Sequence, residues 1–173
     1  MQLSTHFVTG VLIDKLVRGL HLPQPAGALT TAAACYLSHG VLDKLARATY
    51  HPPDPLDDPF WKGYHHQILP AFTWFSVLWF GPRHWFAMLC SALPDLDWVV
   101  RGLTRRFGWS IPGWDKPILN EGLHAALDQI PLVRRLNDLP DLRHERKGVL
   151  VEAGLVALVL GAIVLLDRMG RGR

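Results

Sequence analysis

The residues that could do chemistry are histidines and carboxylates set within apolar stretches. His39 and Asp43 stand four residues apart in YLSHGVLDKL, so on a helix they project from the same face. Burying an ionisable group costs free energy unless the group is paired or bound to something. Neutral imidazole and carboxylate are both zinc ligands. The pair is therefore either a hydrogen-bonded structural couple or part of a metal site.

Two more segments extend this pattern. SALPDLDW places Asp95 and Asp97 directly after a long apolar run, where two carboxylates repel each other unless a cation lies between them. They could instead occupy the first turn of a helix, whose dipole favours negative charge. NEGLHAALDQ repeats the imidazole–carboxylate spacing with His124 and Asp128, and Glu121 shares the face of His124.

A further histidine, in STHFVTG, lies near the start of the chain. The candidate metal ligands are therefore His6, His39, Asp43, Asp95, Asp97 and His124. Such a set could hold one to three divalent ions, zinc first among them, between the helices of a bundle. A bound ion lowers the pKa of its water, and the hydroxide can attack an ester or phosphodiester. Glu121 or Asp128 would then take the proton or orient a ligand histidine.

The elements that must position these residues are expected to be helices. Residues 3–20 follow an amphipathic helical pattern with Ser4 or Thr5 as the N-cap, and residues 26–45 are rich in Ala and Leu. Residues 68–93 are apolar and divided by a Gly-Pro pair, so they form either two helices or one kinked span. No alternating strand pattern of useful length occurs. We therefore predict an all-α, membrane-embedded bundle of five or six helices.

The C-terminal segment is the most apolar part of the chain. Residues 148–166 carry a single charge, Glu152, and a helix of that length reaches roughly 28 Å, close to the hydrocarbon thickness of a bilayer. We predict a helical domain over 1–147 that carries the candidate site, a transmembrane helix over 148–167 and a basic tail over 168–173. Basic residues flank the helix on both sides, so the positive-inside rule gives no orientation.

Composition narrows the classes of partner. Although 49% of the residues are apolar, the net charge is only +3, and the basic residues are scattered singly. This argues against a nucleic-acid surface and favours membrane lipid as the surroundings. The two cysteines, Cys35 and Cys90, form no C-x-x-C pair and are expected to be unpaired buried thiols.

The motifs THFVTG, YLSHGVLDKL, LPDLD and EGLHAALD resemble those of the metal-dependent hydrolases of bacterial inner membranes, which are similar in pattern to the α-helical zinc-dependent phospholipases C. That family carries an N-terminal histidine, an L-P-D-(I/L)-D motif, a histidine in H-R-G-x-T-H-S and an S-H-x-x-x-D motif. The matching positions are His6, Asp95 with Asp97, His124, and His39 with Asp43. Here S-H-x-x-x-D precedes L-P-D-L-D, and Asn120 and Glu121 replace the family's His and Arg.

The resemblance implies a zinc-dependent hydrolase in the bacterial inner membrane. Together with the residues, it predicts a membrane-bound enzyme that cleaves phosphoesters or lipid-like esters, with an amphiphilic substrate such as a phospholipid. One alternative is a non-catalytic integral membrane protein in which the same groups bind a structural metal or line an ion or proton pathway. Another is a soluble helical domain with one C-terminal anchor and ordinary core histidines.

Overall fold

All regular structure in the part of the chain that the computed structural model describes, residues 1–52, 57–112, 114 and 117–171, is helical. The predicted all-α class is therefore confirmed, and six of the helices in these residues have nine residues or more. The α-helices are α1 (Leu3–Gly19), α2 (Gln24–Leu45), α3 (Pro59–Gly63), α4 (Leu69–Ala92), α5 (Leu96–Phe107), α6 (Leu119–Leu127), α7 (Pro131–Arg134) and α8 (Gly148–Arg171). Shorter helical turns join several of them, among them Leu93–Asp95 between α4 and α5.

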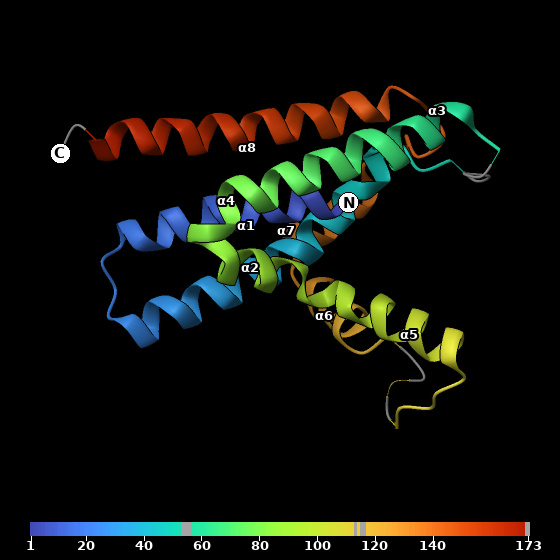
Figure 1. Ribbon diagram of the computed structural model, residues 1–173, viewed down its shortest axis with the longest axis horizontal. Coiled ribbons are helices and arrows are strands. Elements are labelled where there is room, and N and C mark those ends of the chain that lie inside the picture. Colours follow the sequence, from blue (N-terminus) through green and yellow to red (C-terminus); the bar gives the residue numbers. More distant parts are fainter. Residues whose placement is uncertain (53–56, 113, 115–116, 172–173) are drawn as a thin grey trace.

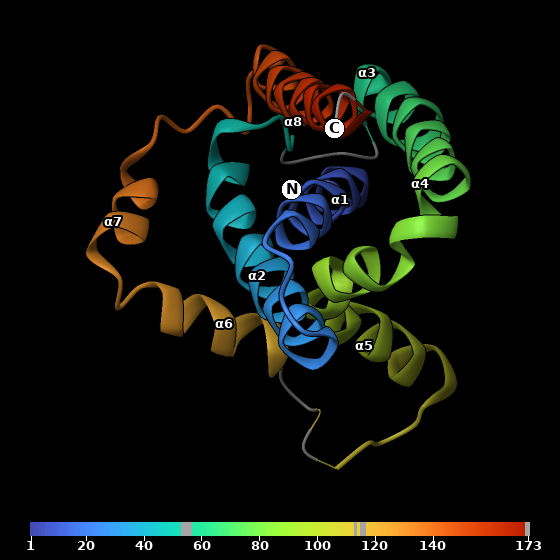
Figure 2. The ribbon, with the colours of Figure 1, turned by 90° about the vertical axis from the view of Figure 1, so that its left-hand side faces the viewer.

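Helix α1 lies in the middle of the bundle, and α2, α4 and α8 surround it (Figure 2). Val8 and Val11 of α1 are fully buried against Met88 of α4 and against Val159 and Ile163 of α8. Helices α5 and α6 diverge from the other helices, as Figure 1 shows. His6, on α1, therefore lies at the centre of the bundle, between α2, α4 and α8.

The start of α1 differs from the expected N-cap. Gln2 is the N-cap and makes no side-chain capping bond, whereas Ser4 and Thr5 lie buried within the first turn. The Thr5 hydroxyl donates to Glu152 of α8 at 2.9 Å. The prediction of Ser4 or Thr5 as the cap was wrong because a neighbouring helix, which the local pattern does not reveal, offers Thr5 a carboxylate acceptor.

The apolar run over residues 68–93 forms one kinked helix, α4, rather than two separate helices. Pro82 has no amide hydrogen to donate within the helix, and two residues later His84 has non-helical backbone angles (φ −128°, ψ 15°). Figure 2 shows the resulting bend in α4. The second half of α4 consequently turns back toward α2 and brings Ser91 beside His39.

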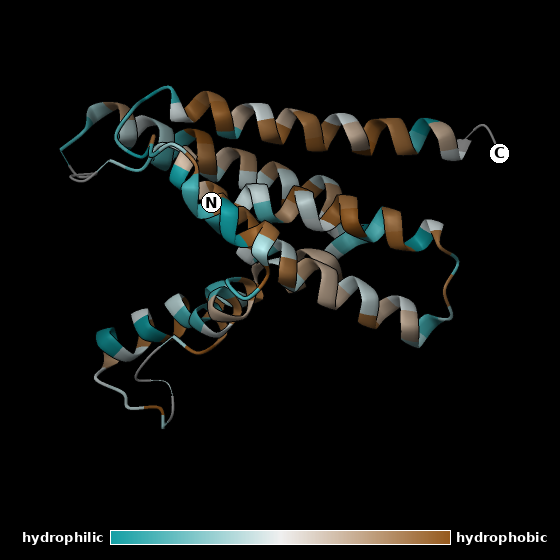
Figure 3. Cartoon of the chain, turned by 180° about the vertical axis from the view of Figure 1, so that it is seen from behind, coloured by the Kyte–Doolittle hydropathy of each residue, from teal (hydrophilic) through white to brown (hydrophobic). Residues whose placement is uncertain are grey.

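Helix α8 is long and apolar enough to cross a membrane, with a candidate span over Gly148–Gly170 of mean hydropathy 2.7 and only 17% of it buried. Figure 3 shows that hydrophobic residues cover most of its length. The helix continues to Arg171, so the first residues of the predicted basic tail are helical, and residues 172–173 lie outside the described chain. Leu158 on α8 and Trp74 and Trp79 on α4 are largely exposed. An apolar outer surface of this kind suits contact with lipid.

Candidate metal site

Three of the predicted ligands converge between α1 and α2. One ligand atom from each of His6, His39 and Asp43 can be chosen so that all lie within 4.8 Å of one another. Asp43 Oδ1 lies 3.3 Å from His6 Nε2, and Asp43 Oδ2 lies 3.1 Å from His39 Nε2. The two imidazole rings are stacked, with centroids 3.9 Å apart. Both rings thus present a nitrogen to one carboxylate.

Close packing of helices makes this convergence possible. A Cβ atom on Gly10, one turn after His6, would lie 2.8 Å from the carbonyl oxygen of Ala87 and 2.9 Å from Ser91 Oγ. Only glycine allows α1 to approach α4 this closely. On α2, Gly40 makes room in the same way for Leu123 and Leu127 of α6.

His39 is held in the form that metal-binding histidines adopt. Its Nδ1 lies 2.7 Å from the Ser91 carbonyl oxygen. A carbonyl oxygen can only accept, so Nδ1 carries the hydrogen and donates it, which leaves the lone pair of the neutral ring on Nε2. That nitrogen faces Asp43 and lies 3.6 Å from Asp95 Oδ1. A backbone carbonyl that fixes the ring in this way is a common outer partner of a metal ligand.

The buried ring nitrogens lack hydrogen-bond partners. His6 Nδ1, His6 Nε2 and His39 Nε2 are all buried, and none of them makes a hydrogen bond of acceptable geometry with any residue that the structure describes. The short distances to Asp43 are therefore contacts between charges and lone pairs rather than good hydrogen bonds. Buried polar atoms in native proteins are nearly always satisfied. Unsatisfied nitrogens gathered around an ionised carboxylate are what a divalent cation would complete, so these residues fit a metal ion.

The ionisation states of His6 and Asp43 suit a cation, whereas His39 favours a proton when no cation is bound. Burial lowers the pKa of His6 to about 4, against the opposing effect of Asp43, so this ring is neutral at physiological pH. Burial acts to raise the pKa of Asp43, but His124, His39 and His6 together hold it far below its usual range. Burial also acts to lower the pKa of His39, and there the effects of Asp43 and the Ser91 carbonyl prevail and raise it. An ionised carboxylate beside a neutral imidazole is a zinc-binding combination.

Two other predicted ligands lie at the edge of this cluster. His124 Nε2 is 3.6 Å from Asp43 Oδ2, and Asp95 Oδ1 is 3.6 Å from His39 Nε2. Both side chains are partly exposed, unlike those of His6 and His39. Burial raises the pKa of Asp95, and so does the neighbouring charge of Asp43. His124 and Asp95 are therefore placed to complete a coordination sphere or to exchange protons beside it.

Asp97 does not join the cluster. It is fully buried, its Oδ1 accepts from Trp114 Nε1 at 2.8 Å, and its Oδ2 accepts from the backbone amide of Asn120 at 2.8 Å. Burial acts to raise the pKa of Asp97, but these donors lower it overall. The structure therefore does not bring Asp97 to the other predicted ligands: its carboxylate secures the start of α6, because it faces that helix rather than His39.

The two residues predicted to handle protons also lie elsewhere. Asp128 accepts from Lys44 Nζ at 2.7 Å and from Asn137 Nδ2 at 2.9 Å. Glu121 is exposed on α6, and no hydrogen bond to it is found among the described residues. The structure thus brings neither carboxylate to His6, His39 and Asp43. Asp128 is the C-cap of α6 and keeps helical backbone angles, and its carboxylate pairs with Lys44 of α2 instead of joining the cluster.

Glu152 is a polar residue whose role sequence reasoning missed. It is buried at 3% exposure on α8, and it accepts from the Gln2 amide at 3.1 Å, from Thr5 Oγ1 at 2.9 Å and from the Tyr64 hydroxyl at 3.3 Å. The signal was present, because a lone acid in an apolar helix marks a specific partner. Glu152 ties the first turns of α8 to the segment that carries His6.

A cavity of about 540 Å³ opens beside the cluster. Asp43 and His124 form part of its wall, and the cationic residues Lys44, Arg47 and Arg143 form another part. His51 also lines the cavity, and its ring Nε2 lies 3.3 Å from the side-chain Nε2 of Gln2. A small molecule that carries negative charge could therefore reach Asp43 and His124 from this side.

Replacing Asp97 by Asn tests its role at the start of α6. In Asp97→Asn the new side-chain NH2 group would face either the Trp114 ring N–H or the Asn120 amide N–H, and two donors cannot bond to each other. We therefore expect the free energy of unfolding to fall by about 1–3 kcal/mol, with the metal content unchanged. Because the folded-state pKa is depressed, the contribution of the carboxylate is present above its unfolded pKa of about 3.9 and is lost as the pH falls through the folded value. The stability difference between the proteins should therefore narrow in acid.

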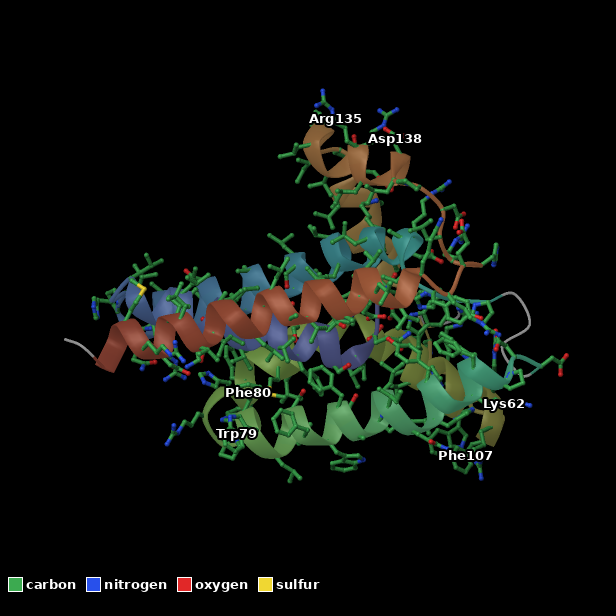
Figure 4. The ribbon with its side chains drawn as sticks, turned by 90° about the horizontal axis from the view of Figure 1, so that it is seen from above. Lys62, Trp79, Phe80, Phe107, Arg135 and Asp138 are labelled. Carbon is green, nitrogen blue, oxygen red and sulfur yellow. The ribbon has the colours of Figure 1, made fainter. Side chains whose placement is uncertain are left out.

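Denaturant unfolding at several pH values measures this difference. The matched control is Asp138→Asn, since Asp138 is exposed and lies on the outer side of the segment after α7 (Figure 4). A variant that keeps its stability but loses metal would return Asp97 to the ligand set.

No family model, curated protein or solved structure matches this chain.

Proposed function

We propose that this chain is a membrane-bound, metal-dependent hydrolase that cleaves phosphoesters or lipid-like esters. The observation that carries the proposal is the meeting of His6, His39 and Asp43, with buried nitrogens that lack partners, at the wall of an open cavity. A divalent ion held there, with zinc as the first candidate, would supply a Lewis acid and a water of lowered pKa.

The residues divide into those that hold the ion and those that could serve the reaction. His6, His39 and Asp43 hold it, and the Ser91 carbonyl keeps the His39 ring in the correct tautomer. His124 adjoins Asp43 and lines the cavity, so it is the group that can carry a proton between the site and a bound substrate. It replaces the sequence-based candidates Glu121 and Asp128 in that role.

The charge of the cavity favours a phosphoester among possible ester substrates. Arg47 and Arg143 line its wall, and guanidinium forms paired hydrogen bonds with phosphate oxygens. Arg143 is already paired with Asp141 through two hydrogen bonds, whereas Arg47 Nη2 is 3.9 Å from that carboxylate, so Arg47 is the better candidate to bind a phosphate. The bonds from Gln2 and Thr5 to Glu152 place the site near the beginning of α8. If α8 crosses a bilayer, this end lies at the lipid boundary, where the headgroup of an amphiphilic substrate is found.

A non-catalytic metal site is the second candidate function, and one observation favours it. His6 and His39 are 1% and 0% exposed, and Asp43 also contacts the amino group of Met1 at 2.8 Å. Closed, buried ligand sets are typical of structural metal sites, whereas catalytic sites keep a position open. A hydrolysis assay separates the two functions.

For the assay, the detergent-purified protein is incubated with bis(p-nitrophenyl) phosphate, with and without a chelator. We expect hydrolysis that the chelator abolishes and added zinc restores. Arg47→Gln should raise KM about tenfold with a smaller change in kcat, because the side chain binds the substrate's charge rather than the ion. Arg135→Gln serves as the matched control, since Arg135 is exposed (Figure 4) and does not line this cavity. Zinc binding without any chelator-sensitive hydrolysis of phosphodiesters or esters would favour the structural site.

Membrane attachment through α8 has its own test. We expect the full chain to stay in the membrane fraction after washes with high salt and alkaline carbonate and to be released by detergent, because only detergent replaces the lipid around a spanning helix. Leu158→Arg places a charge in the middle of the span on its exposed side and should reduce membrane integration. Release by salt alone would show that α8 is not embedded.

A further inference from the structure

A second polar cluster lies about 12 Å along α1 from His6, counted to Asp14. Asp14, two and a half turns beyond Thr5, accepts from His84 Nδ1 at 2.6 Å and from Arg18 Nε at 2.8 Å. Nearby, Lys15 pairs with Asp167 of α8 at 2.5 Å. Polar contacts thus join α1 to α8 at two places along their length, Lys15 with Asp167 here and Thr5 with Glu152 near the metal site. Apolar contacts between the two helices lie between these places.

The bend in α4 builds this cluster. The non-helical backbone at His84 aims the ring at Asp14, and both side chains are about nine-tenths buried. Arg18 Nη2 donates to the carbonyl oxygen of Arg83 at 3.2 Å, so the bend is tied to α1 through the backbone as well. Arg83 therefore has a fixed position at the bend. Figure 4 shows Trp79 and Phe80, which precede it, on the part of α4 that lies toward the C-terminal end of α8.

The cluster carries positive charge in excess. Asp14 is shared by Arg18 and His84, and Asp167 is taken by Lys15. Within the part of the chain that the structure describes, no ion pair joins the exposed guanidinium of Arg83 to a carboxylate, whereas the backbone oxygen of Arg83 accepts from Arg18. A guanidinium in this position lacks the anion that it normally binds.

Two adjoining cavities of about 610 and 580 Å³ meet at these residues. Arg18, Arg83 and His84 line both of them. The remaining walls are partly apolar, with Trp85 and Phe86 in the first cavity and Leu166 and Met169 in the second. Cationic groups at the meeting point of apolar walls match a ligand with a charged group attached to an apolar body.

We propose that Arg83 and Arg18 bind a phosphate group at this second site. Two guanidinium groups are suited to the several oxygens of a phosphate, each through paired hydrogen bonds. The phosphate could belong to a lipid headgroup or be free inorganic phosphate. Basic pockets between helices at the end of a membrane span bind lipid headgroups in this way. The site is separate from His6, His39 and Asp43, so its presence does not depend on the proposed hydrolysis.

The test measures the midpoint of thermal unfolding of the full chain in detergent. The first arm contains phosphatidylglycerol in mixed micelles, the second contains inorganic phosphate, and the third contains chloride at equal ionic strength. We expect the midpoint to rise in the first arm or the second, which identifies the source of the phosphate. Arg83→Gln should weaken the apparent affinity at least tenfold, and Arg83→Lys should weaken it less, because lysine keeps the charge and loses the paired bonds. Arg168→Gln is the matched control, since Arg168 lies at the same end of α8 but outside both cavities.

The outcomes are distinct. A rise that Arg83→Gln removes and Arg168→Gln keeps supports the site. No rise in either ligand arm, or a rise that Arg83→Gln leaves intact, overturns it. Should Arg83→Gln fail to fold, as judged by circular dichroism without ligand, Arg83→Lys alone carries the comparison: an affinity equal to that of the unsubstituted chain then counts against the proposal.

Discussion

Asp43→Asn should lower the affinity for zinc by more than about 100-fold, beyond the loss seen when an outer partner of a ligand is removed. Both buried histidines and His124 approach Asp43. Asn has nearly the same shape but no charge, so the two imidazoles would face an uncharged amide. Chelator-sensitive hydrolysis should disappear together with the metal. Isothermal titration with zinc measures the affinity, and elemental analysis of the purified protein measures the metal content.

Two controls distinguish this result from general damage to the fold. Asp128→Asn and Glu121→Gln alter carboxylates that the structure places outside the cluster, and both should keep the metal. Zinc should raise the unfolding temperature of the unsubstituted chain and of these controls, but not that of Asp43→Asn, because a ligand stabilises only the state that binds it. Retention of zinc by Asp43→Asn and loss of it by Glu121→Gln would move the site to α6.

Gly10→Ala should destabilise the protein by about 1–3 kcal/mol and weaken zinc binding at the same time. The new methyl group would lie 2.8 Å from the backbone oxygen of Ala87 and 2.9 Å from Ser91 Oγ, and a backbone atom cannot move aside cheaply. Helix α1 must then shift away from α4. That shift displaces His6 relative to His39, whose ring is bound to the Ser91 carbonyl. Denaturant unfolding and zinc titration of one preparation measure both effects.

Gly122→Ala is the matched control for this prediction. A Cβ at Gly122, within α6, meets nothing inside 4 Å. Exchanging glycine for alanine inside a helix normally adds about 0.5–1 kcal/mol of stability. If Gly10→Ala behaved like Gly122→Ala, the close approach of α1 to α4 would have no part in forming the site.

Features that depend on local spacing could be predicted from the sequence. The four-residue interval between His39 and Asp43 fixed their common direction on α2, and the structure places both at the cluster. The apolar run after residue 147 predicted α8, and the Gly-Pro pair in the second apolar run allowed for the bend in α4. In each case the chemistry of a few neighbouring residues determines the geometry, so no knowledge of the fold is required.

Features that depend on tertiary packing could not be predicted in the same way. His124 and Asp128 have the same spacing as His39 and Asp43, yet Asp128 lies past the end of α6 and pairs with Lys44. Asp97 is two residues from Asp95 but faces Asn120. Spacing gives the direction of a side chain on its own helix, whereas the neighbouring helix decides what it meets.

Zinc-edge X-ray absorption spectroscopy of the detergent-purified protein shows whether His6, His39 and Asp43 bind zinc. We expect a bound ion with two imidazole nitrogens at about 2.0–2.1 Å and at least one carboxylate oxygen at about 2.0–2.2 Å. The imidazole contribution should fall in His39→Ala, because this variant removes one of the two buried rings and leaves His6. A spectrum of hexahydrated zinc, or an unchanged histidine signal in His39→Ala, would contradict this assignment.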